Sequence, residues 1–109
     1  MTIDPFPFQT LNWEDIPEEI HAGETGRAYW QVRYLNAIRV RKVKYSAGYK
    51  ADHWCKKGHV LHCVEGEMET ELEDGRIFIL KKGMTYLVGD NNEAHRSSSH
   101  EGCQLFIVD

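Results

Sequence analysis

The stretch His53-Trp54-Cys55-Lys56-Lys57-Gly58-His59 places three potential metal ligands within seven residues, and a fourth candidate, His95, follows downstream. Neutral imidazole and cysteine thiolate suit borderline and softer divalent ions, and magnesium and calcium prefer oxygen ligands. Side chains alternate between the two faces of an extended strand, so His53 and Cys55 are expected to point the same way. The sequence therefore predicts one divalent transition metal ion, with zinc, iron or nickel favoured, held by His53, Cys55, His59 and His95.

Length and composition indicate one globular domain around this stretch. The chain has 109 residues, of which 41% are hydrophobic and 28% charged, and no apolar run approaches the roughly 20 residues that span a bilayer. The first ten residues resemble no secretory leader, and three irregularly spaced cysteines form no disulfide framework. We expect a cytoplasmic protein with free thiols and no membrane segment.

Glycines recur in the second half of the chain at intervals of six to ten residues, and this spacing is typical of the turns between short strands in an all-β sandwich or barrel. Residues 67–73 alternate strictly between glutamate and Met68, Thr70 or Leu72, and Asp74-Gly75 then predicts a hairpin turn. Further strands are expected at residues 29–34, 37–45, 76–80 and 105–108. Residues 1–26 contain all three prolines and predict an extended arm with one helical turn near residues 13–20, ahead of a β-barrel domain at 27–109.

Charge is unevenly distributed along the chain. Residues 27–57 hold nine of the thirteen basic residues and one acid, although the formal net charge of the whole chain is −4. We expect the basic strand at residues 37–45 to pair with the acidic strand at 65–73, within the chain or across a dimer. The overall acidity disfavours binding to a phosphate backbone, so no nucleic-acid partner is predicted.

The ligand candidates fall in a pattern that resembles the two motifs of the cupin superfamily. Gly48, His53, Cys55, His59 and the segment 63–67 resemble the first motif, and the stretch from Gly83 to His95 resembles the second. The chain is most similar to small, single-domain, largely uncharacterised cupins with a DHCW motif. That likeness is carried by the following segments: Asp52-His53-Trp54-Cys55, Lys57-Gly58-His59, Val88-Gly89-Asp90, His95-Arg96-Ser97 and Leu105-Phe106-Ile107-Val108-Asp109.

The resemblance implies a double-stranded β-helix, or jelly-roll barrel, with the metal ion inside. It also implies a homodimer that pairs through its N-terminal strands, here with Tyr29-Trp30 and residues 37–45 at the contact. Two departures from the motif keep the chemistry open, since a cysteine replaces one histidine and a histidine replaces the glutamate. By strand position alone, the pocket candidates are Tyr49, Met68, Tyr86 and Phe106.

Several interpretations of this site remain open. Four protein ligands would close a tetrahedral zinc site, whereas iron or nickel with the same ligands would keep two positions for substrate or dioxygen. Oxygenase or isomerase activity on a small polar molecule is one hypothesis, and a non-catalytic metal-binding, ligand-binding or redox-sensing module is the alternative. The ligand candidates also have ordinary interpretations: His53 and His59 as surface loop residues, Cys55 as a buried apolar side chain, and His95 as a turn cap.

Overall fold

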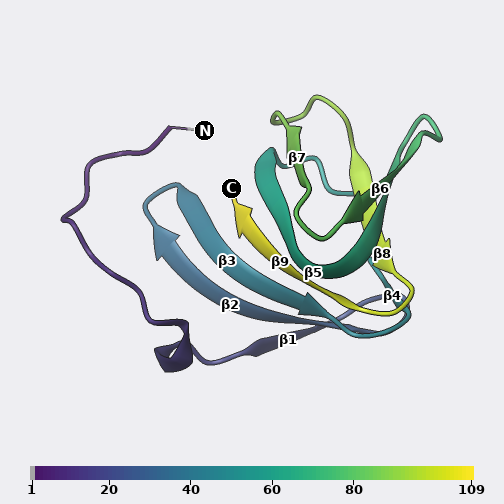
Figure 1. Ribbon diagram of the computed structural model, residues 1–109. Coiled ribbons are helices and arrows are strands. Elements are labelled where there is room, and N and C mark those ends of the chain that lie inside the picture. The colour runs from purple at the N-terminus through teal and green to yellow at the C-terminus, as the bar shows by residue number, and fades with distance from the viewer. Residues whose placement is uncertain (1) are drawn as a thin grey trace.

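The computed structural model describes residues 2–109, and its regular secondary structure is almost entirely antiparallel β-strand (Figure 1). None of the described helices is long and apolar enough to pass through a bilayer. The elements are a short 3-10 helix η1 (Trp13–Asp15) and strands β1 (Glu19–Ala22), β2 (Arg27–Leu35), β3 (Ile38–Tyr45), β4 (Tyr49–Lys50), β5 (His59–Leu72), β6 (Ile77–Lys81), β7 (Thr85–Val88), β8 (His95–Ser99) and β9 (Cys103–Val108).

The strands form one curled sheet in the order β1-β2-β3-β9-β5-β8-β4, and β6 and β7 both pair with β5. Figure 1 shows the curl, which runs from β1 and β2 through β9 and β5 to the strands β6, β7 and β8 opposite. The all-β expectation is confirmed. The strands expected at 29–34, 37–45, 76–80 and 105–108 are present, with ends that differ by up to two residues.

Strand β5 is the element that joins the two sides of the curl. Its first part pairs with β7 and β9, and its second part pairs with β6 and β8. The register shifts between Cys63 and Glu65, which marks a β-bulge, and Gly66 follows with a φ of 78°. A bulge bends a strand and increases its twist. Gly66 therefore lies within one bent strand, whereas the regular glycine spacing predicts a break between short strands.

Replacing Gly66 with alanine should destabilise the fold more than replacing Gly48. Both glycines have a φ of 78°, so an alanine is strained at either position, by roughly 1–2 kcal/mol. A Cβ at position 66 would also lie 2.5 Å from the Gly102 carbonyl oxygen, whereas a Cβ at position 48 meets no atom within 4 Å. Urea unfolding of both variants gives the comparison. Equal losses of unfolding free energy would contradict the role assigned to this close approach.

Alternation along the strands separates the core from the outer surface. Met68, Thr70 and Leu72 are buried on β5, as the pattern of residues 67–73 predicts, and the glutamates between them point outward. Asp74 and Gly75 form the expected turn, where Gly75 has a φ of 94°. The buried apolar cluster takes residues from β2, β3, β5, β6 and β9: Ala28, Val43, Leu61, Cys63, Met68, Leu80, Cys103, Leu105 and Ile107.

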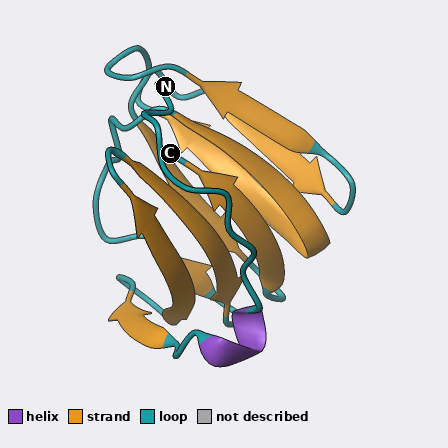
Figure 2. Cartoon of the chain, turned by 90° about the vertical axis from the view of Figure 1, so that its left-hand side faces the viewer, coloured by secondary structure: helices purple, strands orange, loops and turns teal. Residues whose placement is uncertain are grey.

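The N-terminal segment runs across the outer face of the sheet, as Figure 2 shows, and then enters it. The Gln31 side chain donates hydrogen bonds to the carbonyl oxygens of Trp13 and Ile16, both at 2.8 Å. The helical turn expected over 13–20 is shorter, because Pro17 disfavours helix at the residue before it. Strand β1 pairs with β2, so the sheet begins within the segment 1–26 that the sequence indicates as an arm.

The expected pairing of the basic strand with the acidic strand within the chain is wrong. Strand β3 pairs with β2 and β9, and β9 separates it from β5. Arg39 and Arg41 share the inner face of β3 with the buried Val43, whereas Lys42 and Lys44 are exposed on the outer face. Strand alternation explains this division. The Arg39 and Arg41 side chains of the basic strand therefore point into the curl instead of meeting an acidic strand.

Candidate functional site

Three of the four predicted ligands lie together at the open end of the curl. One donor atom from each of Cys55, His59 and His95 lies within 4.8 Å of the others. The backbones of Cys55 and His95 exchange two hydrogen bonds, at 2.7 and 2.9 Å, which fixes the loop residue Cys55 against the first residue of β8. His59 is the first residue of β5, so the three ligand candidates come from separate elements.

The loop between β4 and β5 is anchored where it leads into His59. The Gly58 amide donates to Asp90 Oδ1 at 2.7 Å, and the Asn91 amide donates to the Lys56 carbonyl at 2.8 Å. A side chain at position 58 would place its Cβ 2.6 Å from the Asp90 nitrogen. Glycine is therefore required for this close approach. It lets the segment 56–58 dock on the turn at 89–91 and present His59 to the interior.

The two imidazoles face each other through their Nε2 atoms, which lie 2.8 Å apart. Each Nδ1 has an oxygen partner: His59 Nδ1 donates to Asp109 Oδ2 at 3.1 Å, and His95 Nδ1 donates to the Glu93 carbonyl at 2.9 Å. With the protons on Nδ1, neutral rings direct two Nε2 lone pairs at each other. This repulsive arrangement requires a proton or a cation between the rings.

The same arrangement fits a metal ion. Imidazole nitrogens bind zinc at about 2.0–2.1 Å, so two such nitrogens are roughly 3.3 Å apart at the tetrahedral angle and, at similar bond lengths, roughly 2.9 Å apart at the right angle of an octahedral ion. Metal-bound histidines almost always donate their other N–H to a carboxylate or a carbonyl, and both acceptor types are present here. The donor set of one thiol and two imidazoles suits a borderline or softer ion. The residues therefore fit the transition metal that the cupin resemblance implies.

The electrostatic setting differs among the three side chains. The His95 imidazole is the main cause of the lowered pKa of the Cys55 thiol. Burial acts to lower the pKa of His95, but its interactions with Cys55 and the Glu93 carbonyl outweigh burial and raise it. Burial lowers the pKa of His59. His59 thus favours the neutral form that binds metal, and Cys55 is inclined towards the thiolate.

His53 stands apart from this cluster. Its side chain is 76% exposed, and its Nδ1 lies 2.6 Å from Asp52 Oδ1. It lies at the edge of the hollow that holds the other three, and its role as a ligand stays a prediction. The structure therefore presents a three-donor set. Three protein ligands leave an open position even on a tetrahedral zinc ion, as catalytic zinc sites do.

A hollow of about 200 Å³ lies over the three donors, inside the curl. Of the four pocket candidates, Tyr49 and Tyr86 line it. Met68 is 1% exposed and belongs to the core beyond. Phe106 lies on the outer face of β9, where its ring meets Trp13 edge-on, so it does not line this hollow. Alternation explains the last placement, because Leu105 and Ile107 occupy the inner face.

Sequence reasoning missed the buried charges behind His59. Asp109 accepts two hydrogen bonds from Arg39, both at 3.0 Å, and one from Arg41 at 2.8 Å, in addition to the bond from His59. Its side chain has no exposed area. The signal was present in β3, where Arg39 and Arg41 alternate in phase with Val43 and Tyr45. The sequence offered no comparable signal for Asp109.

Asp109 should make the fold acid-sensitive. Burial acts to raise the pKa of its carboxyl, but hydrogen bonds from His59 and Arg39 and the nearby charge of Arg41 outweigh burial and hold the pKa well below its usual range. A depressed folded-state pKa stabilises the fold above the unfolded value of about 3.9, and the contribution is lost as pH falls below it. Unfolding free energies between pH 6 and pH 3 should therefore fall more steeply for wild type than for Asp109→Asn. Parallel slopes would contradict this.

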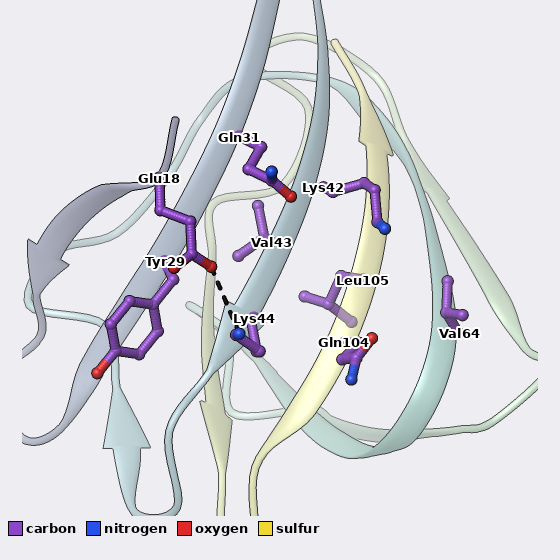
Figure 3. A pocket seen from close by; sticks show the side chains of 9 residues that line it. All are labelled: Glu18, Tyr29, Gln31, Lys42, Val43, Lys44, Val64, Gln104 and Leu105. Carbon is purple, nitrogen blue, oxygen red and sulfur yellow. Dashed lines mark ion pairs between the residues drawn. The ribbon is translucent and has the colours of Figure 1, made fainter. Parts of the chain in front are cut away.

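A second hollow, of about 150 Å³, lies on the outer face of the sheet (Figure 3). Lys42 and Lys44 line it, and Lys44 pairs with Glu18 at 3.4 Å. Its lining contains no cysteine or histidine, so it lacks the donors found inside the curl.

The residues expected at a dimer contact lie on different faces of the sheet. Tyr29 lies on the outer face, whereas Trp30 lines the inner hollow and is not available for a dimer contact on the outer face. The homodimer stays a prediction, and light scattering tests it.

Comparison of the whole structure with solved proteins identifies the fold. An RmlC-like cupin from Shewanella frigidimarina matches with a TM-score of 0.70 at 22% identity, over 94% of this chain and 89% of that one. The fold is the cupin fold. An ectoine synthase from P. lautus matches with a TM-score of 0.74 at 19% identity, over 93% and 76% of the two chains. A predicted oxalate decarboxylase from Thermotoga maritima matches with a TM-score of 0.77 at 15% identity, over 92% and 96%.

These likenesses confirm the expected cupin architecture. No protein-family model and no curated protein matches the chain. Membership of the DHCW group stays a prediction. The cluster of Cys55, His59 and His95 is a possible metal site by its own geometry.

Proposed function

We propose that this cupin binds one divalent transition metal ion through Cys55, His59 and His95 and uses the open coordination positions to bind and convert a small polar molecule. The observation that carries the proposal is the pair of Nε2 atoms 2.8 Å apart, with both Nδ1 atoms committed to oxygen acceptors. A bound cation relieves the repulsion between the two lone pairs. Cys55 adds a third donor, and its lowered pKa favours the thiolate that metals bind.

An enzyme is favoured over a closed structural site for two reasons. Structural zinc sites use four protein ligands, and the cluster offers three. The hollow above the cluster gives a small molecule access to the ion. When bound, the ion supplies Lewis-acid or redox chemistry at these positions. The structural neighbours include an ectoine synthase and a sugar phosphate isomerase, and both names are consistent with a small polar substrate.

The surrounding side chains hold the ligands and present fixed donors. Asp109 and the Glu93 carbonyl orient the two imidazoles. Burial raises the pKa of Tyr86 far above its ordinary value, so its phenol remains protonated and can donate a hydrogen bond. Its ring centroid lies 5.8 Å from that of His59 and 6.0 Å from that of His95. Tyr86 is therefore placed to orient a ligand beside the ion.

Elemental analysis of protein purified without a metal-affinity tag tests the proposal. We expect about one equivalent of zinc, iron or nickel per chain. The cobalt-substituted protein should change its visible spectrum when azide is added, because azide fills an open position. Metal below a tenth of an equivalent, with no ion raising the melting temperature of the protein, would overturn the metal site. A stoichiometric ion whose spectrum ignores azide would overturn the open position.

A redox-sensing module is the second candidate, and the setting of Cys55 favours it. The thiol is partly exposed and its pKa is lowered, both of which promote reaction with oxidants. Cys63 and Cys103 are buried and their pKa values are raised, in the case of Cys103 to about 11, so they serve as internal references. Mass spectrometry after peroxide treatment of metal-free protein should find oxidation at Cys55 alone. An inert Cys55 would remove this candidate.

A further inference from the structure

The hollow over the metal-site residues has a one-sided charge. Arg39 and Arg41 line it from the inner face of β3, and among the described residues no aspartate or glutamate lines it. Arg96 also borders it, but its guanidinium pairs with the outward-pointing Glu71, its register partner. Arg41 is 5% exposed, and guanidinium groups remain charged in proteins, because their ordinary pKa exceeds 12. Two fixed positive charges therefore face a space that the protein itself does not fill.

The carboxylates behind these guanidiniums neutralise only part of the charge. Asp109 carries one negative charge and pairs with both Arg39 and Arg41. Arg96 pairs with Glu71 at 2.7 Å and lies with its guanidinium carbon 4.4 Å from the centre of the Trp54 ring. One buried positive charge is thus left over beside Asp109. An unpaired charge away from water is costly, so a negative ligand in the hollow is favoured.

Hydrogen-bond donors are also in surplus. A guanidinium has five N–H donors, but within residues 2–109 Arg41 makes one side-chain hydrogen bond, to Asp109, and its Nε has no partner. Ser97 is buried in the same wall. The lining therefore offers donors to an acceptor-rich ligand, and oxyanions have such acceptors.

We propose that the ligand of this hollow is a small oxyanion that carries a carboxylate or a phosphate group and binds against Arg39 and Arg41, next to the three metal ligands. The planar fork of arginine matches both groups. A volume of about 200 Å³ lies below the range of drug-sized sites and limits the ligand to a small metabolite. The assignment rests on the proposed function, since it names the substrate class of the same site. A divalent metal ion bound by one thiolate and two neutral imidazoles would keep a net positive charge, which would further favour an anion in the hollow.

The test compares acetate with acetamide, which have nearly the same shape but differ in charge, and adds pyruvate and inorganic phosphate as further probes. Each is titrated into chelator-treated and metal-reloaded protein at constant ionic strength, and melting temperature and heat of binding are measured. We expect saturable binding of acetate and pyruvate, or of phosphate, and none of acetamide. Carboxylate binding without phosphate binding, or the reverse, identifies the group. The absence of saturable binding by all three anions would overturn the proposal.

Variants locate the binding. Arg39→Gln should raise the apparent Kd of the bound anion roughly ten-fold or more, because a charge-assisted hydrogen bond is lost. Arg41→Gln should do the same if it folds, and Arg39→Gln, at the less buried of the two positions, decides the matter if it does not. Arg33→Gln is the matched control, since Arg33 contacts Gln9 away from this hollow. An equal loss in Arg33→Gln, or unchanged binding in Arg39→Gln, would overturn the assignment.

This experiment distinguishes a failure of the proposed metal site from a failure of the proposed oxyanion site. Elemental analysis of the reloaded protein reports on the metal site alone, and anion binding to the chelator-treated protein reports on the arginines alone. Anion binding by a protein that takes up no metal on reloading would reject the proposed metal enzyme and keep the oxyanion site. A stoichiometric metal with no anion binding would reject the oxyanion site and keep the metal.

Discussion

Single replacement of Cys55, His59 or His95 by alanine will weaken transition-metal binding by more than about 100-fold. Changes to residues that only orient a metal ligand already cost about 10–100-fold in affinity, and these three side chains supply the donor atoms themselves. A three-donor site has no spare protein ligand to compensate. Isothermal titration of chelator-treated protein with zinc, together with elemental analysis after gel filtration, measures the loss.

His53→Ala is the matched control for this series. The His53 side chain is exposed and pairs with Asp52, so we expect its removal to change metal affinity by less than the three donors do. A circular dichroism spectrum of each variant confirms that the sheet is retained. A loss in His53→Ala as large as that in His95→Ala would show that His53 completes a four-ligand site. Unchanged affinity in His59→Ala or His95→Ala would contradict the site itself.

Asp109→Ala will be the most destabilising side-chain truncation near the site. The carboxylate is fully buried and accepts hydrogen bonds from Arg39, Arg41 and His59. Removing one partner of a buried ion pair leaves an uncompensated charge and typically costs 3–5 kcal/mol. Here two guanidiniums lose their partner, and Arg41 is itself buried. Guanidinium chloride unfolding at pH 7 measures the change in unfolding free energy.

Arg76→Ala provides the comparison at the surface. Arg76 also contacts two carboxylates, those of Asp74 and Glu93, but its side chain is 52% exposed. Exposed ion pairs contribute little to stability, because water solvates the separated charges well. We therefore expect a small effect in Arg76→Ala and a large one in Asp109→Ala. Similar losses in the two variants would mean that the buried cluster is not the stabilising element described above.

The strands were largely predictable because alternation and turn chemistry act over a few residues. Residues 67–73 and the Asp74-Gly75 turn have the predicted structure, and strands β2 and β3 lie where aromatic and β-branched residues indicated them. The continuation of β5 through Gly66 was not predictable. It depends on a bulge whose register is set by pairing with β9, about forty residues away in the sequence.

The sequence by itself determined the all-β fold, the hairpin turn at Asp74-Gly75 and the donor types Cys55, His59 and His95, because spacing and alternation place side chains locally. Only the tertiary structure decided which candidates converge. His53 lies apart from the donors, Phe106 faces outward, and Arg39 and Arg41 turn inward to meet Asp109. These outcomes depend on which strands become neighbours when the sheet curls. That choice is made by long-range pairing and burial, which no local pattern encodes.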